Sequence, residues 1–226
     1  SLLVSGVDAS AASVSSGKVV IDLTGVQPLN EIEVKRDKVV IGTGLNLGRL
    51  ARDASGANGL LRQAASIIAN PLVRNKVTFV EALSPDSPYF DITTPLMLLE
   101  AKVRLQSPLG KRSLSIRDYL DTATKGLKKA EIPTAVEFAG LPADAKVGFF
   151  RVARMGGKGS VSAAARLRLV RTVVKDPEIV VSSHTLVPLR VVQAEKEIVD
   201  KPASEDFIKK AAEVAADEIL EMAEKD

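Results

Sequence analysis

The stretch from Arg74 to Asp91 reads Arg-Asn-Lys-Val-Thr-Phe-Val-Glu-Ala-Leu-Ser-Pro-Asp-Ser-Pro-Tyr-Phe-Asp, and its interpretation decides the fold. Asn, Thr, Ser and Asp side chains bond to nearby backbone groups, and proline does not continue a helix, so this composition predicts an ordered loop. Residues 60–69 before it are apolar at helical spacing, and Pro71 ends that pattern. The sequence therefore predicts a helix that leads into a structured loop.

Together with Ile68 to Val73, this stretch resembles the second flavin motif of the FAD-binding medium subunits of molybdenum hydroxylases, the xanthine dehydrogenase and carbon monoxide dehydrogenase family. The family pattern is Arg-Asn-x-Gly-Thr-x-Gly-Gly-Asn, then a short spacer, then Pro-x-x-Asp. An alignment without gaps keeps five of its residues, which are Arg74, Asn75, Thr78, Pro88 and Asp91.

The same alignment loses the glycines of the motif and its second asparagine. Val77, Val80, Glu81 and Ala82 stand in their places. Glycine lets the backbone approach a pyrophosphate and present its N–H groups, and a β-branched residue prevents this. A carboxylate near a diphosphate costs about 4 kcal/mol per unit charge at 4 Å with an effective dielectric near 20. We therefore expect the family fold without the family's cofactor.

The N-terminal residues Leu2 to Asp8 resemble the first flavin motif of the family, an apolar strand that runs into Gly-Gly-Thr-Asp. Gly6 and Asp8 match this motif, whereas Ser5 and Val7 do not. Further along, Ile41 to Leu50 resembles the family's Ile-Gly-Ala-x-Thr-Thr-x-x-x-Leu, which leads into a helix. There the two threonines are replaced by Leu45 and Asn46.

The C-terminal part also resembles the family. Phe149 to Arg154 and Ser160 to Leu167 resemble a strand pair of its C-terminal domain, and Pro188 and Arg190 match a Pro-x-Pro-x-Arg turn. The resemblance implies an α+β fold with two domains: a FAD-binding (PCMH-type)-like domain, then a smaller α/β sandwich like the C-terminal domain of carbon monoxide dehydrogenase flavoproteins. We expect the first domain at residues 1–114, a linker at 115–132 and the second domain at 133–226.

Hydrophobic periodicity predicts the individual elements. The Ser-rich residues 9–17 are expected to form a loop. We also expect a strand at 19–23, a hairpin of 32–35 with 38–42, a helix at 94–100, a strand at 101–106 and an amphipathic helix at 204–224.

Composition excludes several kinds of chemistry. The 226 residues contain no cysteine, so this chain forms no disulfide, thiolate metal site or cysteine-ligated iron–sulfur cluster. The single histidine, His184, lies beside Ser183, but neighbours in sequence point apart, so we expect no catalytic residue. We also expect no metal site. No apolar run is long enough to cross a bilayer and no signal peptide is evident, which favours a cytoplasmic protein.

Charge is unevenly distributed. Residues 146–175 hold eight Lys and Arg residues and no acid, while 176–226 is acid-rich. A nucleic-acid contact at Arg166, Arg168 and Arg171 is a distant alternative to a solvated or subunit-facing surface, because aromatic residues for stacking are scarce. The loop 155–160 lacks the spacing of a phosphate-binding motif. We expect Glu195 and Glu197 to be solvated.

We expect a divergent medium subunit that has lost FAD and acts as an interaction or scaffold subunit. The resemblance implies as partners an iron–sulfur small subunit and a molybdenum-cofactor large subunit; self-association is an alternative. If the family function is retained, the chain is instead an electron-transfer subunit. FAD would then contact the residues that still match the two motifs, which are Gly6, Asp8, Asn75, Thr78 and Asp91.

Overall fold

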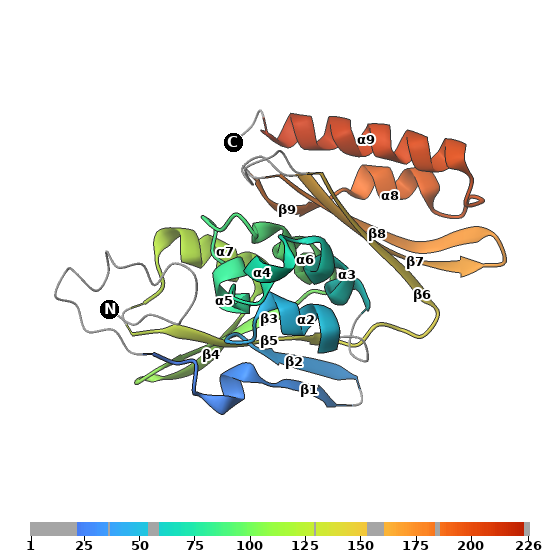
Figure 1. Ribbon diagram of the computed structural model, residues 1–226. Helices are drawn as coiled ribbons and strands as arrows, with labels where there is room; N and C mark the ends of the chain where they lie inside the picture. The colour runs from blue at the N-terminus through green and yellow to red at the C-terminus, as the bar shows by residue number, and fades with distance from the viewer. Residues whose placement is uncertain are drawn as a thin grey trace.

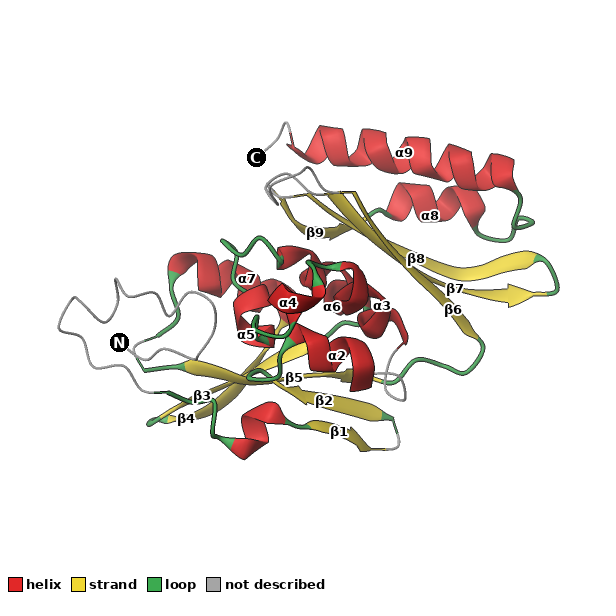
Figure 2. Ribbon diagram, in the orientation of Figure 1, coloured by secondary structure: helices red, strands yellow, loops and turns green. Residues whose placement is uncertain are grey.

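The computed structural model describes residues 22–35, 37–53, 59–128, 130–152, 161–183 and 186–223. Within these ranges the chain forms a five-stranded sheet, a layer of helices, a four-stranded sheet and a final pair of helices (Figures 1 and 2). Helices α3 (Gly59–Ile67) and α6 (Thr93–Leu98) lie between the two sheets. The observed fold is the α+β arrangement that the sequence predicted.

The first sheet is antiparallel throughout, with strand order β1-β2-β5-β3-β4. The predicted hairpin is confirmed, since residues 32–35 pair with 38–41. Residues 22 and 23 lie outside any strand, and the rest of the strand expected at 19–23 lies outside the described residues. The strands are β1 (Ile32–Lys35), β2 (Lys38–Gly42), β3 (Lys102–Ser107), β4 (Gly110–Ser115) and β5 (Ile132–Ala139).

The first sheet extends past the boundary that we expected between the domains. Strand β5, which was to open the second domain at Pro133, is the central strand of the first sheet, where it pairs with β2 and β3. The expected linker contains helix α7 (Ile116–Lys125), whose Tyr119 and Leu120 lie in the core of the first sheet. The first structural unit therefore extends to Ala139. Pairing between strands this far apart in sequence leaves no local signal.

Helices cover one face of the first sheet (Figure 2). Their apolar residues and the inward residues of the strands form one core. Two predicted elements are confirmed within a residue or two of their ends, the helix at 60–69 and the helix at 94–100. The helical elements are η1 (Gln27–Asn30), α2 (Leu47–Asp53), α3 (Gly59–Ile67), α4 (Pro71–Arg74), α5 (Phe79–Ala82), η3 (Phe90–Ile92) and α6 (Thr93–Leu98).

The second sheet has the order β6-β7-β8-β9 and is also antiparallel. The predicted strand pair and the predicted C-terminal helix are confirmed over the described residues; His184 and the loop 155–160 lie outside them. Pro188 and Arg190, expected in a turn, lie in the last strand. The elements are β6 (Ala145–Val152), β7 (Val161–Val170), β8 (Val173–Ser183), β9 (Leu186–Arg190), α8 (Val192–Ile198) and α9 (Glu205–Ala223).

The two sheets share one hydrophobic core. Phe149, Ala164 and Val180 of the second sheet belong to the same buried cluster as the first sheet and its helices. A buried hydrogen bond of 2.7 Å joins the hydroxyl groups of Thr94 on α6 and Ser162 on β7. The second sheet therefore packs directly against the helical layer.

Glu195 is buried at 6% exposure, in contrast to the solvated position we expected. Its Oε1 accepts hydrogen bonds from the backbone N–H of Ile179 (2.8 Å) and from Nε of Arg190 (2.8 Å), and its Oε2 accepts one from Nη2 of Arg190 (3.0 Å). The carboxylate fixes α8 to β8 and β9. Its partners precede it in the chain by sixteen and five residues, so the local charge pattern did not reveal them.

We expect Glu195→Ala to lower the free energy of unfolding by about 2–3 kcal/mol, because it leaves a backbone donor and a guanidinium without their acceptor. Urea unfolding followed by circular dichroism measures this change. Glu213→Ala, at an exposed position of α9, is the matched control and should alter stability by less than about 0.5 kcal/mol. Equal effects of both substitutions would contradict the role of Glu195.

Candidate functional site

The segment that resembles the second flavin motif is a loop that contains short helical turns. It contains α4, α5 and η3, and Val77, which stands in place of a motif glycine, is buried in the core. A valine at this position therefore contributes to hydrophobic packing. Four of the residues retained from the motif, Arg74, Asn75, Thr78 and Asp91, each contact another residue of the chain.

Arg74 closes the end of the preceding helix. Its Nη1 donates hydrogen bonds to the carbonyl oxygens of Ser66 (2.8 Å) and Ala69 (2.7 Å). Ala69 has a positive φ of 58°, as is common where a helix ends. The guanidinium satisfies carbonyl groups that the end of α3 leaves without intrahelical partners.

Asn75 lies against α2. It is the residue after α4, and its backbone N–H donates to the carbonyl of Pro71 (3.1 Å). Its Oδ1 is so close to Gly48 that a Cβ atom added there would approach it to 2.2 Å. The glycine at position 48 permits this contact between the loop and the helix.

Thr78 and Glu81 bond to each other at the start of α5. Oε2 of Glu81 accepts hydrogen bonds from the backbone N–H of Thr78 (2.7 Å) and from its hydroxyl group (2.8 Å). The sequence suggested that Glu81 would face a bound diphosphate. The carboxylate instead turns back and satisfies the first backbone donor of its own helix.

The next two backbone donors are also used within the protein. The N–H of Phe79 donates to the carbonyl of Leu45 (2.7 Å), and the N–H of Val80 donates to that of Thr43 (2.9 Å). In return, the N–H of Leu47 donates to the carbonyl of Val77 (2.9 Å). Residues 77–80 of the loop are thus bonded to residues 43–47.

The hydrogen bonds of this loop determine whether it can bind the pyrophosphate of FAD. Binding would require free backbone N–H groups, but those of Thr78, Phe79 and Val80 already have acceptors inside the protein. A carboxylate also occupies the end of α5 where an anion would be stabilised. The residues of this loop do not fit a diphosphate in the conformation described.

The second segment with departures from the family has a similar explanation. Leu45 is fully buried in the core. The Oδ1 of Asn46 accepts a hydrogen bond from the N–H of Arg49 (2.8 Å) in the first turn of α2. Both residues therefore support the fold at positions where the family pattern has threonine.

Asp91 is buried and forms an ion pair with Arg151 of β6, with 2.5 Å between Oδ2 and Nε. The two side chains have 6% and 13% of their surface exposed. This pair links the end of the loop to the second sheet. Sequence reasoning found Asp91 but missed Arg151, which was recognised only as part of a strand.

The structure gives the sequence-predicted site residues separate surroundings. Asn75 contacts α2, Thr78 bonds to Glu81, and Asp91 bonds to β6. Gly6 and Asp8 lie outside the described residues. The three described residues do not bond to one another.

Three basic residues of the stretch 146–175 pair with acids that follow it in the chain. Arg166 pairs with Glu178 (2.6 Å), Arg168 pairs with Asp176, and Lys175 pairs with Asp200 (2.5 Å). Strands β7 and β8 are antiparallel neighbours, which brings the basic and acidic segments side by side. The charge separation seen in the sequence is therefore much smaller in space.

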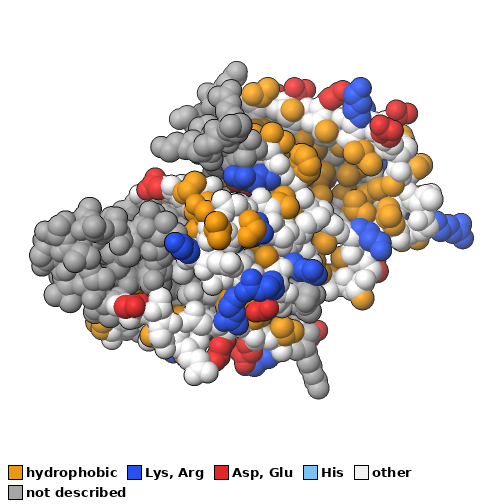
Figure 3. All heavy atoms as spheres, in the orientation of Figure 1, with side chains coloured by type: hydrophobic (Ala, Val, Ile, Leu, Met, Phe, Trp, Pro, Cys, Tyr) orange, Lys and Arg blue, Asp and Glu red, His pale blue; other side chains and the backbone are white. Residues whose placement is uncertain are grey.

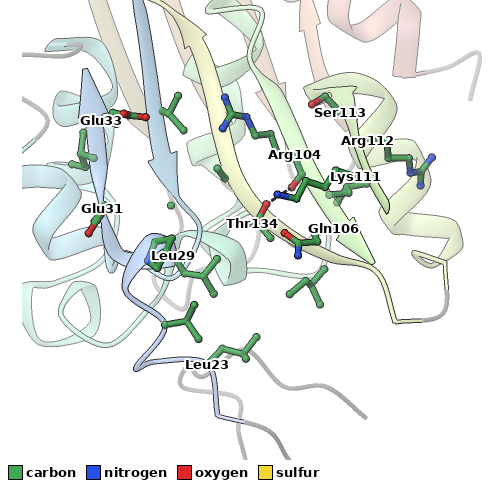
Figure 4. A pocket seen from close by; sticks show the side chains of 18 of the residues that line it. Leu23, Leu29, Glu31, Glu33, Arg104, Gln106, Lys111, Arg112, Ser113 and Thr134 are labelled. Atoms are coloured by element: carbon green, nitrogen blue, oxygen red, sulfur yellow. Dashed lines mark hydrogen bonds between the residues drawn. The ribbon is translucent and has the colours of Figure 1, made fainter. Parts of the chain in front are cut away.

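A groove of about 1120 Å³ lies on the face of the first sheet that the helices leave open (Figure 4). One wall is apolar and includes Leu23 and Leu29, and the other carries Arg104, Gln106 and Lys111. No sequence motif pointed to these residues. Figure 4 shows Leu23 and Leu29 on one side of the groove and the polar side chains of β3 and β4 on the other.

Arg104 of this groove is held by a carboxylate. Arg104 and Lys38 both pair with Glu137 of β5, the lysine at 2.8 Å. Burial acts to raise the pKa of Glu137, but the hydrogen bonds from Lys38 and Arg104 outweigh it and lower the pKa below 4.5.

In the described part of the chain no helix has the length and apolar character needed to cross a membrane.

Solved structures share this fold. Quinoline 2-oxidoreductase from Pseudomonas putida 86 matches with a TM-score of 0.81 at 22% identity, over 95% of this chain and 77% of that chain. Carbon monoxide dehydrogenase from Hydrogenophaga pseudoflava matches with a TM-score of 0.77 at 21% identity, with the same coverage. The fold is that of the FAD-binding medium subunits of molybdenum hydroxylases, as the sequence predicted.

Sequence comparison identifies the family. Residues 5–139 match the family described as the FAD binding domain in molybdopterin dehydrogenase, and the chain belongs to that family. The chain is also 24% identical over 209 residues to the glyceraldehyde dehydrogenase medium chain of Sulfolobus acidocaldarius. The aligned region covers 91% of this chain and 74% of that protein. The match ends at the last residue of β5, where the sheet pairing also places the end of the first unit.

We expect Thr78→Ala and Glu81→Ala each to lower the free energy of unfolding by about 1 kcal/mol, since each removes the bonding at the start of α5. The double variant should lose less than the sum, because the two residues share the same hydrogen bonds. Urea denaturation checks this, with the exposed Asp86→Ala as control. Fully additive losses would contradict the shared bonding.

Glu137→Gln tests the ion pairs on the open face. A lowered pKa in the folded state means that the carboxylate stabilises the protein above its ordinary pKa of 4.5 and that this contribution is lost as the pH falls through the folded-state value. The stability difference between wild type and Glu137→Gln should be largest near neutral pH and shrink below about pH 4.5. Thermal unfolding across this range measures it, and a pH-independent difference would contradict it.

Proposed function

We propose that this protein is a divergent medium-type subunit of a molybdenum hydroxylase-like oxidoreductase that has given up FAD and serves as an interaction subunit. The observation that supports this most directly is the internal use of the backbone donors of Thr78, Phe79 and Val80. FAD could enter this loop only after these bonds broke and the Glu81 carboxylate moved away.

The Glu81 carboxylate and a bound diphosphate would compete for the same backbone donors. A diphosphate placed near Glu81 meets a repulsion of about 4 kcal/mol per unit charge at 4 Å with an effective dielectric near 20. That corresponds to roughly a thousandfold loss of affinity. Release of the two backbone bonds to residues 43–45 adds to this cost, since buried donors and acceptors would lose their partners.

The family resemblance implies two partner subunits, an iron–sulfur small subunit and a molybdenum-cofactor large subunit. The chain has no cysteine, so any iron–sulfur cluster of such a complex is held by another polypeptide. The glyceraldehyde dehydrogenase relative is itself called a medium chain. A cytoplasmic location belongs to the same proposal.

A second candidate is a working electron-transfer subunit that binds FAD through Gly6, Asp8, Asn75, Thr78 and Asp91. It is favoured by the family match over residues 5–139, which includes all five positions. FAD, when bound, would supply one- and two-electron redox chemistry. In this case the loop 74–82 would have to adopt a different conformation. The nucleic-acid alternative receives little support, because Arg166 and Arg168 are paired with carboxylates.

We expect the purified protein to lack the visible absorption bands of flavin and to take up no FAD after incubation with an excess and desalting. Replacing Val80 and Glu81 by glycine should raise FAD uptake, because this removes the carboxylate and frees the N–H of Thr78. Asp86→Gly is the matched control on the same segment and should leave uptake unchanged. Stoichiometric FAD in the wild type would refute the proposed loss and favour the electron-transfer subunit.

A further inference from the structure

The groove on the open face of the first sheet combines apolar and cationic side chains (Figure 4). Figure 3 shows a different apolar surface, a hollow below α9 over the strands of the second sheet, and no described feature there identifies a ligand. In the groove, by contrast, the charged side chains lie on one wall and the apolar side chains on the other. The groove therefore restricts the chemistry of a molecule that binds in it.

One wall of the groove has an excess of positive charge. Strands β3 and β4 together carry four cationic residues and no acid; the four are Lys102, Arg104, Lys111 and Arg112. Glu131 pairs with Arg112 (2.7 Å), and Glu137 pairs with both Arg104 and Lys38. Among the described residues Lys111 has no ion-pair partner. This wall therefore attracts an anion.

Lys111 lies beside Gln106, because the two residues are cross-strand partners on β4 and β3. Both side chains are exposed and line the groove, and Figure 4 shows them near Thr134 of β5. The hydroxyl group of Thr134 already donates to the carbonyl of Arg104 (3.3 Å), which leaves the Lys111 ammonium and the Gln106 amide as donors. Two such donors on adjacent strands can bind the two oxygens of one carboxylate.

The opposite wall is apolar and comes from the segment before β1. Leu23, Val26 and Leu29 line it, and Val26 is 40% exposed. The η1 turn of this segment packs against β2. Strand β2 lies three strand spacings from β4, which is about 14 Å at a spacing of about 4.8 Å. A ligand that reaches both walls therefore has an anionic end and an extended apolar body.

The acidic residues that line the groove lie far from Lys111. Glu31 and Glu33 are at β1, the edge of the sheet opposite β4. Four strand spacings, or about 19 Å, separate the two edges, which exceeds the Debye length of about 8 Å at physiological ionic strength. Glu33 is also paired with Lys35 (2.7 Å). Repulsion of an anion at Lys111 by these carboxylates is therefore weak.

We propose that this groove binds a small organic carboxylate with an extended apolar body, such as a medium-chain alkanoate. The carboxylate accepts hydrogen bonds from Lys111 and Gln106, and the apolar body extends across the sheet to Leu23, Val26 and Leu29. The loop 74–82 belongs to the helical layer on the other face of the sheet. Binding in the groove is therefore independent of whether the protein binds FAD.

The test is isothermal titration calorimetry of the 226-residue protein with octanoate, 1-octanol and acetate. We expect one saturable site per chain for octanoate. 1-Octanol has the same apolar body without the charge, and acetate has the charge without the body. Each should bind at least about tenfold more weakly, because each lacks the group that one wall of the groove recognises.

Two substitutions test the two walls separately. Lys111→Gln removes the cation, and Val26→Asp places a charge in the apolar wall at an exposed position. Each should lower the affinity for octanoate about tenfold. Lys125→Gln, at an exposed position in the last turn of α7, is the matched control for charge and should not change it. Circular dichroism checks that the three variants fold.

Several results would overturn this proposal: no saturable binding of octanoate, several sites per chain, equal binding of 1-octanol, or equal effects of Lys111→Gln and Lys125→Gln. Uptake of FAD by the wild type would refute the proposed loss of FAD and leave octanoate binding unchanged. The two proposals therefore fail independently.

Discussion

The fold depends on the hydrogen bonding between the loop after α4 and residues 43–47. The donors of Phe79 and Val80 satisfy the carbonyls of Leu45 and Thr43. Thr43 in turn donates its backbone N–H to Thr134 (3.2 Å) and its hydroxyl to Pro133 (2.8 Å), at the start of β5. The loop, the end of β2 and the central strand therefore form one bonded unit.

This bonding explains why the replaced glycines are compatible with a stable protein. A glycine-rich loop that binds phosphate obtains its backbone acceptors from the ligand, so its donors are unsatisfied when the ligand leaves. Here the acceptors come from the polypeptide. Val77 adds apolar burial and Glu81 supplies the carboxylate at the start of α5. The same substitutions that disfavour a diphosphate stabilise the loop without one.

The second structural feature that organises the molecule is the contact between the sheets. The buried pair of Asp91 and Arg151 and the hydrogen bond of Thr94 to Ser162 cross from the helical layer to the second sheet. Removal of one partner of a buried ion pair typically costs about 3–5 kcal/mol. The two units therefore behave as one folded body.

The sequence by itself determined the family, the α+β class, the first hairpin, the helices near 60–69, 94–100 and 204–224, and the loss of the glycines, because these rest on local periodicity and motif spacing. Only the tertiary structure decided that β5 belongs to the first sheet, that Glu195 is buried, that Arg151 holds Asp91 and that Arg166 and Arg168 are neutralised. Each of these depends on pairing between segments whose partner the local pattern does not specify. Strand register and ion-pair partners are set by packing of the whole chain, which periodicity cannot reveal.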